Sequence, residues 1–481
     1  MRRVRRVLGL ATVLAVAPSG CALDGDGQLD GVTLVVSSAT LIDGTGAEPR
    51  ANTTVAMRDG VIAAVSPDGE IDVPQGVQVI DASGKYVIPG LVDTHFHFTL
   101  GAPIPGRADD NQESLARELY YGVTTILQIG ATAGSTDSIL ALKERRARGQ
   151  VEAPYVYGTG GHITLPGTHP IYTVFPPAVR AAADSLTAST PMSEPVDLYS
   201  LGIGMSFVRT EEAARQAVRE RAEGGMDAIK ITVESGPTPF GDDHPQMSVE
   251  MIQAIVDEAS RYGLPVLAHV TSLDELQAAL EGGASGAVHA TQGIPLPDSA
   301  LAEHMAALGF TMSPTLSLFS GPTDSQDPFL LATATEEELV ALANPEFQAR
   351  VGLRWTCCAT FAQVLANVGM LHDSGVRLAV GTDTGNPYVF PGYSVHRELE
   401  FLVEAGLSPM EALVAGTQGA AEMIGAEADF GTIEAGKRAD LLILGADPLE
   451  QIRNTRSLET VISEGRVVDR EGLGLRTRRR R

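Results

Sequence analysis

The stretch "YVIPGLVDTHFHFTLG", residues 86–101, decides how the rest of the chain is interpreted. Its apolar run predicts a buried strand that carries two histidines, His95 and His97, two residues apart. Because residues i and i+2 of a strand share a face, we expect both imidazoles to point to one side while Phe96 points away. Two neutral imidazoles directed at one point can bind a divalent metal. A histidine pair alone is a weak signal, so partners are needed elsewhere.

Short apolar strands alternate with helical patterns from residue 89 to residue 426. This alternation is typical of repeated β–α units around a parallel sheet, and glycine follows most of the helical patterns, as a left-handed C-terminal cap requires. Eight strands are predicted, the number that a closed (β/α)8 TIM-type barrel needs, with its chemistry at the carboxyl ends of the strands. The eight stretches are "GLVDTHFHF", "TTILQIG", "PYVYGTGG", "AIKITVES", "PVLAHV", "GAVHA", "FTMSPTL" and "LAVGTD".

The two ends of the chain have a different texture. Residues 32–88 hold short β-rich runs separated by Gly, Asp and Pro turns, with no helical pattern between them, and a similar texture returns over residues 427–470. We therefore expect an α/β protein in which both ends build one small β-sandwich domain and the barrel, residues 89–426, is inserted between them. Residues 1–31 are a leader and linker, and residues 471–481 are a basic tail.

Two connections within the barrel segment are too long for plain loops. Residues 163–208 are rich in proline and aromatic residues, and residues 317–358 contain a predicted capping box from Thr335 to Glu338. Because long connections at the carboxyl ends of barrel strands usually line a substrate pocket, we expect these two to choose the substrate.

Composition excludes one class of partner. The chain has 481 residues, 44% of them hydrophobic and 20% charged, and its 35 Lys and Arg against 60 Asp and Glu give a net charge of −25. A charge of this sign repels phosphate backbones and anionic lipid headgroups, so no nucleic-acid partner is expected. The closing "LRTRRRR" is typical of a solvated tail.

The N-terminal "MRRVRRVLGLATVLAVAPSGC" has arginines, then a short apolar run, then small residues, which is the pattern of an export signal. Its "PSGC" resembles a bacterial lipobox, although Pro18 replaces the usual aliphatic residue, and predicts lipidation at Cys21. The protein is thus expected outside the cytoplasm, periplasmic or surface-anchored, with the lipid as its sole membrane attachment. The adjacent Cys357 and Cys358 do not indicate a disulfide scaffold.

Four further polar residues lie within or at the end of runs that otherwise predict burial, namely Lys230, His269, His289 and Asp383. An unpaired charge is costly in such a place. Each has an ordinary explanation taken singly, since a lysine can pair with a carboxylate, a histidine can bond a carbonyl and an aspartate can cap a helix. Together with the His95 pair, they occupy strands one, four, five, six and eight, which packing alone does not explain.

These stretches resemble the amidohydrolase superfamily of metal-dependent hydrolases. The resemblance covers nearly the whole exported chain, and it is greatest to the imidazolonepropionase-like and prolidase-like branch. The matching motifs are "VIPGLVDTHFHF", "IKITVESG", "VLAHV", "VHATQG", "GTDTGNP", "GYSVHRELEFLVEAGLSPMEALVAGTQGAAEMIG" and "FGTIEAGKRADLLILGADPL".

The resemblance implies a two-metal site. One metal would be held by His95, His97 and Asp383, the other by His269 and His289, and Lys230 would bridge them as a carbamate formed with CO2. Imidazole-rich donors favour zinc. A water between the metals would become hydroxide and attack the amide carbonyl, while Asp383 would accept its proton and pass it to the leaving amine.

Three residues are candidates for contacting the substrate. His162 ends strand three, where similar family members use a histidine near the substrate carbonyl, and Tyr172 and Arg209 could bind a substrate carboxylate. The other histidines are assigned to the surface or to packing, with His304 and His372 in helical patterns; His169, His244 and His396 lie near loops and could also line the pocket.

The sequence therefore predicts an exported hydrolase that cleaves the amide bond of a small molecule, a dipeptide or an N-acyl amino acid; homo-oligomerisation is left open. One alternative is a cyclic-amide hydrolase or a deaminase on the same barrel, although "VTSLDE" after His269 does not carry the motif of deaminase relatives at this place. Another alternative is a non-catalytic lipoprotein that binds metal or ligand, against which the retained Asp383 argues.

Overall fold

The computed structural model describes residues 30–98, 111–130, 136–234, 245–289, 296, 299–346, 348 and 360–475. The predicted export signal with Cys21, the cysteine pair at 357–358 and His244 lie outside these ranges. Within the described ranges, no helix has the length and apolar character needed to cross a bilayer.

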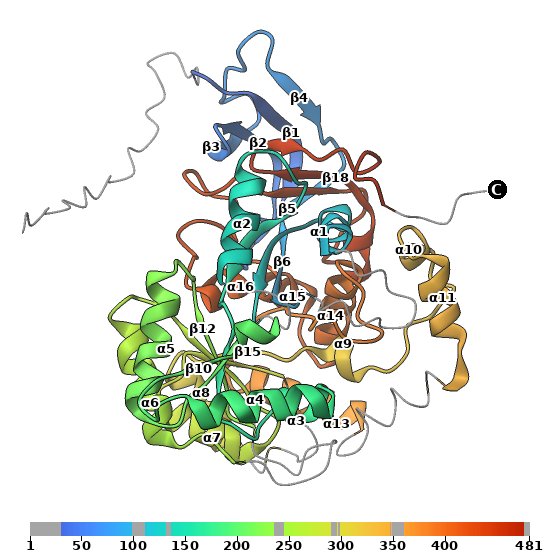
Figure 1. Ribbon diagram of the computed structural model, residues 1–481. Helices are drawn as coiled ribbons and strands as arrows, with labels where there is room; N and C mark the ends of the chain where they lie inside the picture. The colour runs from blue at the N-terminus through green and yellow to red at the C-terminus, as the bar shows by residue number, and fades with distance from the viewer. Residues whose placement is uncertain are drawn as a thin grey trace, which may run out of the picture.

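The two chain ends meet in one mixed sheet of eight strands, drawn in blue and red in the upper part of Figure 1. The C-terminal strands join through antiparallel pairing of β17 with β5, in which Leu442 lies opposite Ile88. The order is β19-β18-β17-β5-β1-β2-β3, with β4 beside β1. The strands are β1 (Leu34–Leu41), β2 (Arg50–Arg58), β3 (Val61–Pro67), β4 (Gln78–Asp81), β5 (Tyr86–Pro89), β17 (Leu441–Leu444), β18 (Leu458–Ser463) and β19 (Arg466–Val467).

The middle of the chain builds mostly parallel strands; each of the first seven predicted stretches contains one, and the eighth shares only Leu378 with β16. The first three form one sheet and the others a second sheet of order β10-β11-β9-β12-β13-β14-β15-β16. The bounds are β6 (Leu91–Phe96), β7 (Val123–Gln128), β8 (Tyr155–Gly158), β9 (His162–Thr164), β10 (Val196–Asp197), β11 (Met205–Phe207), β12 (Ile229–Thr232), β13 (Val266–His269), β14 (Gly286–Val288), β15 (Thr311–Ser313) and β16 (Arg377–Leu378).

Backbone hydrogen bonds join the first and last of these strands. The Thr94 amide donates to Val380 O at 3.0 Å, and Phe96 and Thr384 form a parallel bridge. The eighth predicted strand is therefore regular only over β16, but the chain after it continues alongside β6. This pairing brings residues 93–97 next to residues 380–384.

Helices follow the strands as predicted, and Figure 1 shows α5 to α8 gathered outside β12. Glycines with positive φ end several of them, for example Gly225 (+76°), Gly263 (+69°) and Gly283 (+82°), as a left-handed cap requires. The principal helices are α1 (Asn111–Tyr120), α2 (Thr136–Ala147), α5 (Glu211–Glu223), α6 (Val249–Ser260), α7 (Leu273–Glu281), α8 (Ala300–Ala307), α13 (Phe361–Asp373), α14 (Tyr393–Glu404), α15 (Pro409–Ala415) and α16 (Gln418–Ile424).

The two long connections are structured. The first, residues 163–208, contributes β10 and β11 to the second sheet: β11 runs parallel to β9, with Met205 opposite His162, and β10 pairs antiparallel with β11. The sequence did not predict these strands. It also holds α3 (Ile171–Val174), α4 (Pro177–Ser189) and the 3₁₀ turn η1 (Leu198–Leu201).

The second connection holds α9 (Leu316–Phe319), α10 (Pro328–Leu331) and α11 (Glu336–Ala343), and a further 3₁₀ turn, η2 (Ile452–Arg456), lies near the C-terminus. The capping box predicted from Thr335 to Glu338 is confirmed, because each side chain bonds the other residue's backbone N–H.

Candidate metal centre

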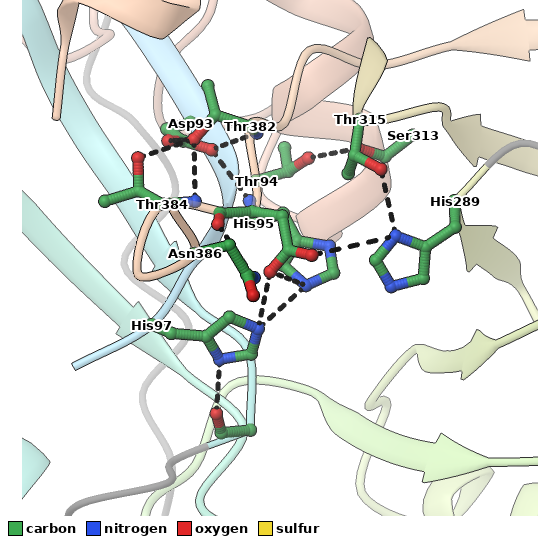
Figure 2. A network of polar contacts seen from close by, with 12 residues as sticks. Asp93, Thr94, His95, His97, His289, Ser313, Thr315, Thr382, Thr384 and Asn386 are labelled. Carbon is green, nitrogen blue, oxygen red and sulfur yellow. Dashed lines mark hydrogen bonds and ion pairs between the residues drawn. The ribbon is translucent and has the colours of Figure 1, made fainter. Parts of the chain in front are cut away.

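His95 and His97 point to the same side of the chain at the end of β6, as the spacing predicts. Their Nε2 atoms lie 3.0 Å apart, and Figure 2 shows the two rings converging. His97 is oriented from behind, because its Nδ1 lies 2.7 Å from Gly130 O at the end of β7. That bond leaves Nε2 directed toward His95.

Asp383 joins the two imidazoles from the segment after β16. Its Oδ1 lies 3.1 Å from His97 Nε2 and 3.5 Å from His95 Nε2. The backbone of Asp383 has φ +65°, a left-handed conformation that is rare outside glycine and is typical of functional sites. The sequence predicted this meeting of strand ends.

Asp93 locks these two segments together, which the sequence prediction missed. Its Oδ1 accepts from the amides of His95 (2.9 Å) and Thr382 (3.0 Å), and its Oδ2 accepts from the Thr382 hydroxyl at 2.6 Å; Figure 2 shows this network. Burial raises the pKa of Asp93 to about 6. The available signal was a carboxylate inside an apolar strand, two residues before the histidine pair.

His289 follows β14 and is the third imidazole of this group. Its Nδ1 lies 2.9 Å from Thr315 Oγ1 and 4.0 Å from Asp383 Oδ2. Both His289 (φ +71°) and Thr315 (φ +51°) have left-handed backbones. Donor atoms of His95, His289 and Asp383 all lie within 4.8 Å of one another, a spacing that could hold a metal ion.

Lys230 is fully buried on β12, and its Nζ has no hydrogen-bond partner in the described part of the chain. Burial lowers the pKa of Lys230 to about 7, against the opposing charge of Asp383. A buried amine with a pKa of about 7 is about half neutral at pH 7 and can then react with CO2, whereas a buried ammonium would repel a nearby cation. The environment of Lys230 therefore fits a carbamate that serves as a metal ligand.

A second group of donors lies beside it. Glu234, just after β12, places its Oε2 3.0 Å from His269 Nε2 and 3.2 Å from His169 Nδ1. The rings of His169 and His269 stack with centroids 4.7 Å apart. The sequence analysis missed Glu234. It also favoured the surface or packing for His169, and this assignment is wrong, because the fold of residues 163–208 brings His169 against His269.

Burial keeps these imidazoles in their neutral, ligating form. It lowers the pKa of His95, His162 and His289 well below the usual value. It lowers the pKa of His169 and His269 to about 3. Lone pairs of neutral imidazoles, the buried carboxylates and a carbamate on the buried Lys230 would together be a suitable donor set for divalent cations.

His162 lies beside the histidine pair. Its ring is nearly parallel to that of His97, with centroids 6.3 Å apart, and its Nδ1 lies 3.0 Å from Thr232 Oγ1. Any Cβ at Gly130 would come within 2.1 Å of His162 Nε2, so only glycine leaves room for this ring. The buried guanidinium of Arg221 donates to Gly161 O (3.0 Å) and His162 O (3.3 Å) and so anchors the backbone here.

Arg209 and Tyr172 are engaged elsewhere. Arg209 donates to three carbonyls at the end of α4, those of Thr187, Thr190 and Pro191. The hydroxyl of Tyr172 bonds Asp184 of α4. These contacts give both side chains a role in holding α4.

The remaining described histidines lie apart from the metal centre. His396 is buried between Thr455 Oγ1 (2.9 Å) and Tyr121 O (2.8 Å), which confirms its assignment to packing. His372 faces Glu411 on the outside of the molecule, 3.5 Å away.

Comparisons with known proteins agree with this geometry. The chain matches the family described as "Amidohydrolase family" over residues 86–468. It is 27% identical over 458 residues to the ochratoxinase of Aspergillus niger, a match that covers 92% of this chain and 87% of that protein. It is 27% identical over 436 residues to the imidazolonepropionase of Symbiobacterium thermophilum, covering 87% of this chain and 90% of that protein.

A solved structure from Bifidobacterium longum, provisionally described as a prolidase, has a TM-score of 0.65 and 28% identity to this chain. The likeness covers 90% of this chain and 94% of that one. It therefore includes both the parallel strands and the sheet built from the chain ends.

Proposed function

The chain belongs to the amidohydrolase family and is a hydrolase that acts on carbon–nitrogen bonds; from this premise we propose that it cleaves the amide bond of a dipeptide or an N-acyl amino acid. The observation that carries the proposal is Lys230, a fully buried amine without a hydrogen-bond partner in the described ranges. It lies among imidazoles and carboxylates, where an unmodified lysine has no structural purpose that the described contacts reveal. The likeness to a protein described as a prolidase supports a dipeptide substrate.

We assign two divalent metals to this centre, with zinc the preferred ion for imidazole donors. His95, His97 and Asp383 would hold one, His269 and His289 the other, and a carbamate on Lys230 would lie between them. When bound, the metals would acidify a water molecule and polarise the scissile carbonyl.

Asp383 is the group placed to move protons. It is 5% exposed, lies within 3.5 Å of two imidazoles and is anchored through its amide, which donates to His95 O at 2.9 Å. In the proposed reaction its carboxylate accepts the proton of the attacking water and delivers it to the leaving amine. The rigid backbone around it holds that carboxylate in place throughout.

His162 is the proposed contact for the substrate carbonyl oxygen. Thr232 occupies its Nδ1, which leaves Nε2 for the substrate. An imidazole N–H in this position would stabilise the negative charge that develops on that oxygen.

The wider architecture is part of the same proposal. The family fold, together with the hydrogen bonds that join β6 to residues 380–384, supports closure of the parallel strands into a (β/α)8 barrel. We propose the barrel at residues 89–426, a β-sandwich from residues 32–88 and 427–470, and export with lipidation at Cys21.

A test begins with metal content and substrate screening. We expect about two equivalents of zinc per chain, and release of free amine from members of a panel of dipeptides and N-acyl amino acids. Lys230→Ala should lose metal and activity, whereas Lys143→Ala, which alters a surface pair with Asp227 (2.6 Å), should keep both. Full activity and full metal content in Lys230→Ala would contradict the proposal.

The alternatives make distinct predictions in the same screen. Turnover of cyclic amides but not of linear ones would favour the second candidate, which the likeness to an imidazolonepropionase supports. A metal-loaded protein that turns over no amide, cyclic amide or ester would favour a binding protein.

A further inference from the structure

Three side chains from three separate elements converge on one point beside the proposed metal pair. His169 comes from the connection after β9, Glu234 from the end of β12 and His269 from the end of β13. Glu234 Oε2 lies 3.0 Å from His269 Nε2 and 3.2 Å from His169 Nδ1. The family motifs supply His269 to the metal site but supply neither His169 nor Glu234.

The spacing of these atoms is that of ligands around a cation. Donor atoms of the three side chains all lie within 4.8 Å of one another. Two ligands in tetrahedral geometry at zinc–nitrogen and zinc–oxygen distances of about 2.0–2.1 Å are separated by about 3.3 Å. The same spacing, 3.0–3.5 Å, separates the donor atoms of His95, His97 and Asp383.

The buried charge of the Glu234 carboxylate is a second reason to expect a cation between these side chains. Glu234 is 2% exposed, and an ionised carboxylate at that depth needs a compensating positive charge. A divalent cation between the carboxylate and the two imidazoles would supply the charge.

His289, which the family pattern gives to the second metal, lies between the two groups. Its Nδ1 lies 4.0 Å from Asp383 Oδ2, and its ring centroid lies 4.9 Å from that of His95 and 4.6 Å from that of His269. Its ring can therefore serve either metal. Two donor sets result, one containing His95, His289 and Asp383 and the other containing His169, Glu234 and His269.

We propose that His169 and Glu234 join His269 as ligands of the second divalent cation of this centre. The inference deepens the proposed function and depends on it for the presence of two metals. It adds a carboxylate and a loop histidine to the ligands, so the long connection that carries His169 would be tied directly to the metal.

The competing explanation is that Glu234 only orients His269 by a hydrogen bond, as a carboxylate commonly does behind a metal-ligating imidazole. The two explanations differ at His169, which would touch no metal in the second case. Variants of His169 therefore discriminate more sharply than variants of Glu234.

The test measures cobalt(II) binding to the full chain after removal of metal. We expect the unaltered protein to bind two equivalents and His169→Asn and Glu234→Gln to keep one after dialysis. His169→Cys should recover the second equivalent and add a near-ultraviolet thiolate-to-cobalt absorption band, because a thiolate replaces the imidazole as ligand. His372→Asn, which changes a histidine outside the centre, should retain both equivalents.

The outcomes separate the two proposals. Two cobalt equivalents in His169→Asn, or a His169→Cys protein without the thiolate band, would overturn His169 as a metal ligand. Neither result would contradict the proposed amide hydrolysis. A protein that binds two metals in this pattern yet cleaves no amide would overturn the proposed function and support the assignment. Far-ultraviolet circular dichroism of each variant confirms that the chain is folded.

Discussion

The two halves of the metal centre are held in place in different ways. The half with His95, His97 and Asp383 is fixed by backbone: Asp383 N bonds His95 O, and His97 N bonds Thr384 O at 2.8 Å. In the half with His169, Glu234 and His269, the side chains hold one another, and His169 comes from a long connection.

This difference assigns the two halves different tasks, the chemical step to the first and the choice of substrate to the second. A site held by paired strands keeps its geometry whatever surrounds it, whereas a site that shares a ligand with a long connection changes when that connection changes. We therefore expect the first half to determine the rate of the chemical step, and the second half to couple metal binding to the shape of the substrate pocket.

Asp383→Asn should lower activity the most, because Asp383 belongs to the half of the centre that the paired strands hold rigid. Removing a general acid–base group typically costs about 10²–10⁴-fold in kcat. We expect a loss in that range with near-normal circular dichroism, measured on the best substrate of the screen. Normal turnover by the variant would show that the rigid half does not carry the proton transfer.

Arg221→Met tests the backbone that carries His162, the proposed substrate contact. The guanidinium is 1% exposed and also bonds Ser206 Oγ at 3.0 Å, so its removal leaves buried carbonyls, including that of His162, without a charged donor. We expect the free energy of unfolding to fall by about 3 kcal/mol and KM to rise, measured by urea denaturation and steady-state kinetics. Arg215→Met, which removes a partly buried guanidinium of α5 that pairs with Asp257 of α6 (3.1 Å), is the control for loss of an arginine that does not bond the His162 backbone. A KM unchanged in Arg221→Met would mean that His162 does not contact substrate.

Glu398→Gln tests the hydrogen bonds that hold the chain segment next to His289. Glu398 of α14 accepts from the amides of Leu316 (2.9 Å) and Ser317, which follow Thr315 in the chain. Burial raises the pKa of Glu398 to about 8. Because this folded-state pKa lies above the unfolded value, stability is lost as pH rises toward 8.

Glutamine does not ionise at position 398. Between pH 6 and pH 8, the free energy of unfolding should therefore fall less in Glu398→Gln than in the unaltered protein, by on the order of 2 kcal/mol. Urea midpoints at several pH values measure this, and the window lies above the pKa of Asp93, about 6. Identical pH profiles for the two proteins would show that Glu398 does not titrate there.

Arg209→Ala should have the smallest effect. The side chain donates to carbonyls at the end of α4, and loss of these bonds should lower the free energy of unfolding by about 1 kcal/mol. KM should be unchanged for substrates with and without a free carboxylate. A selective rise in KM for the carboxylate-bearing substrates would restore Arg209 as a substrate ligand.

The same contrast explains what could be predicted from the sequence. His95, His97 and Asp383 could be placed together because strand periodicity and the common direction of strand ends determine where they lie. Glu234 and His169 could not, because their meeting depends on how residues 163–208 fold. That connection supplied strands β10 and β11, too short to stand out in an irregular stretch.

Asp93 and Arg221 were missed for another reason. Each lies in a clear strand or helix pattern, but its role depends on which backbone atoms face it across an interface. Asp93 bonds Thr382, far along the chain, and Arg221 bonds the turn before β9. A pattern within one element indicates burial but does not identify the partner of a buried polar group.

The sheet shared by the two chain ends also constrains the order in which the protein can be completed during synthesis. β5 pairs with β17, so the edge of the N-terminal strands stays open until the ribosome has made almost the entire chain. Contacts between such distant segments form slowly and leave unpaired strand edges exposed meanwhile. The chain is therefore most vulnerable to misassociation late in translation, and losing the last strands would remove the partner that closes the first sheet.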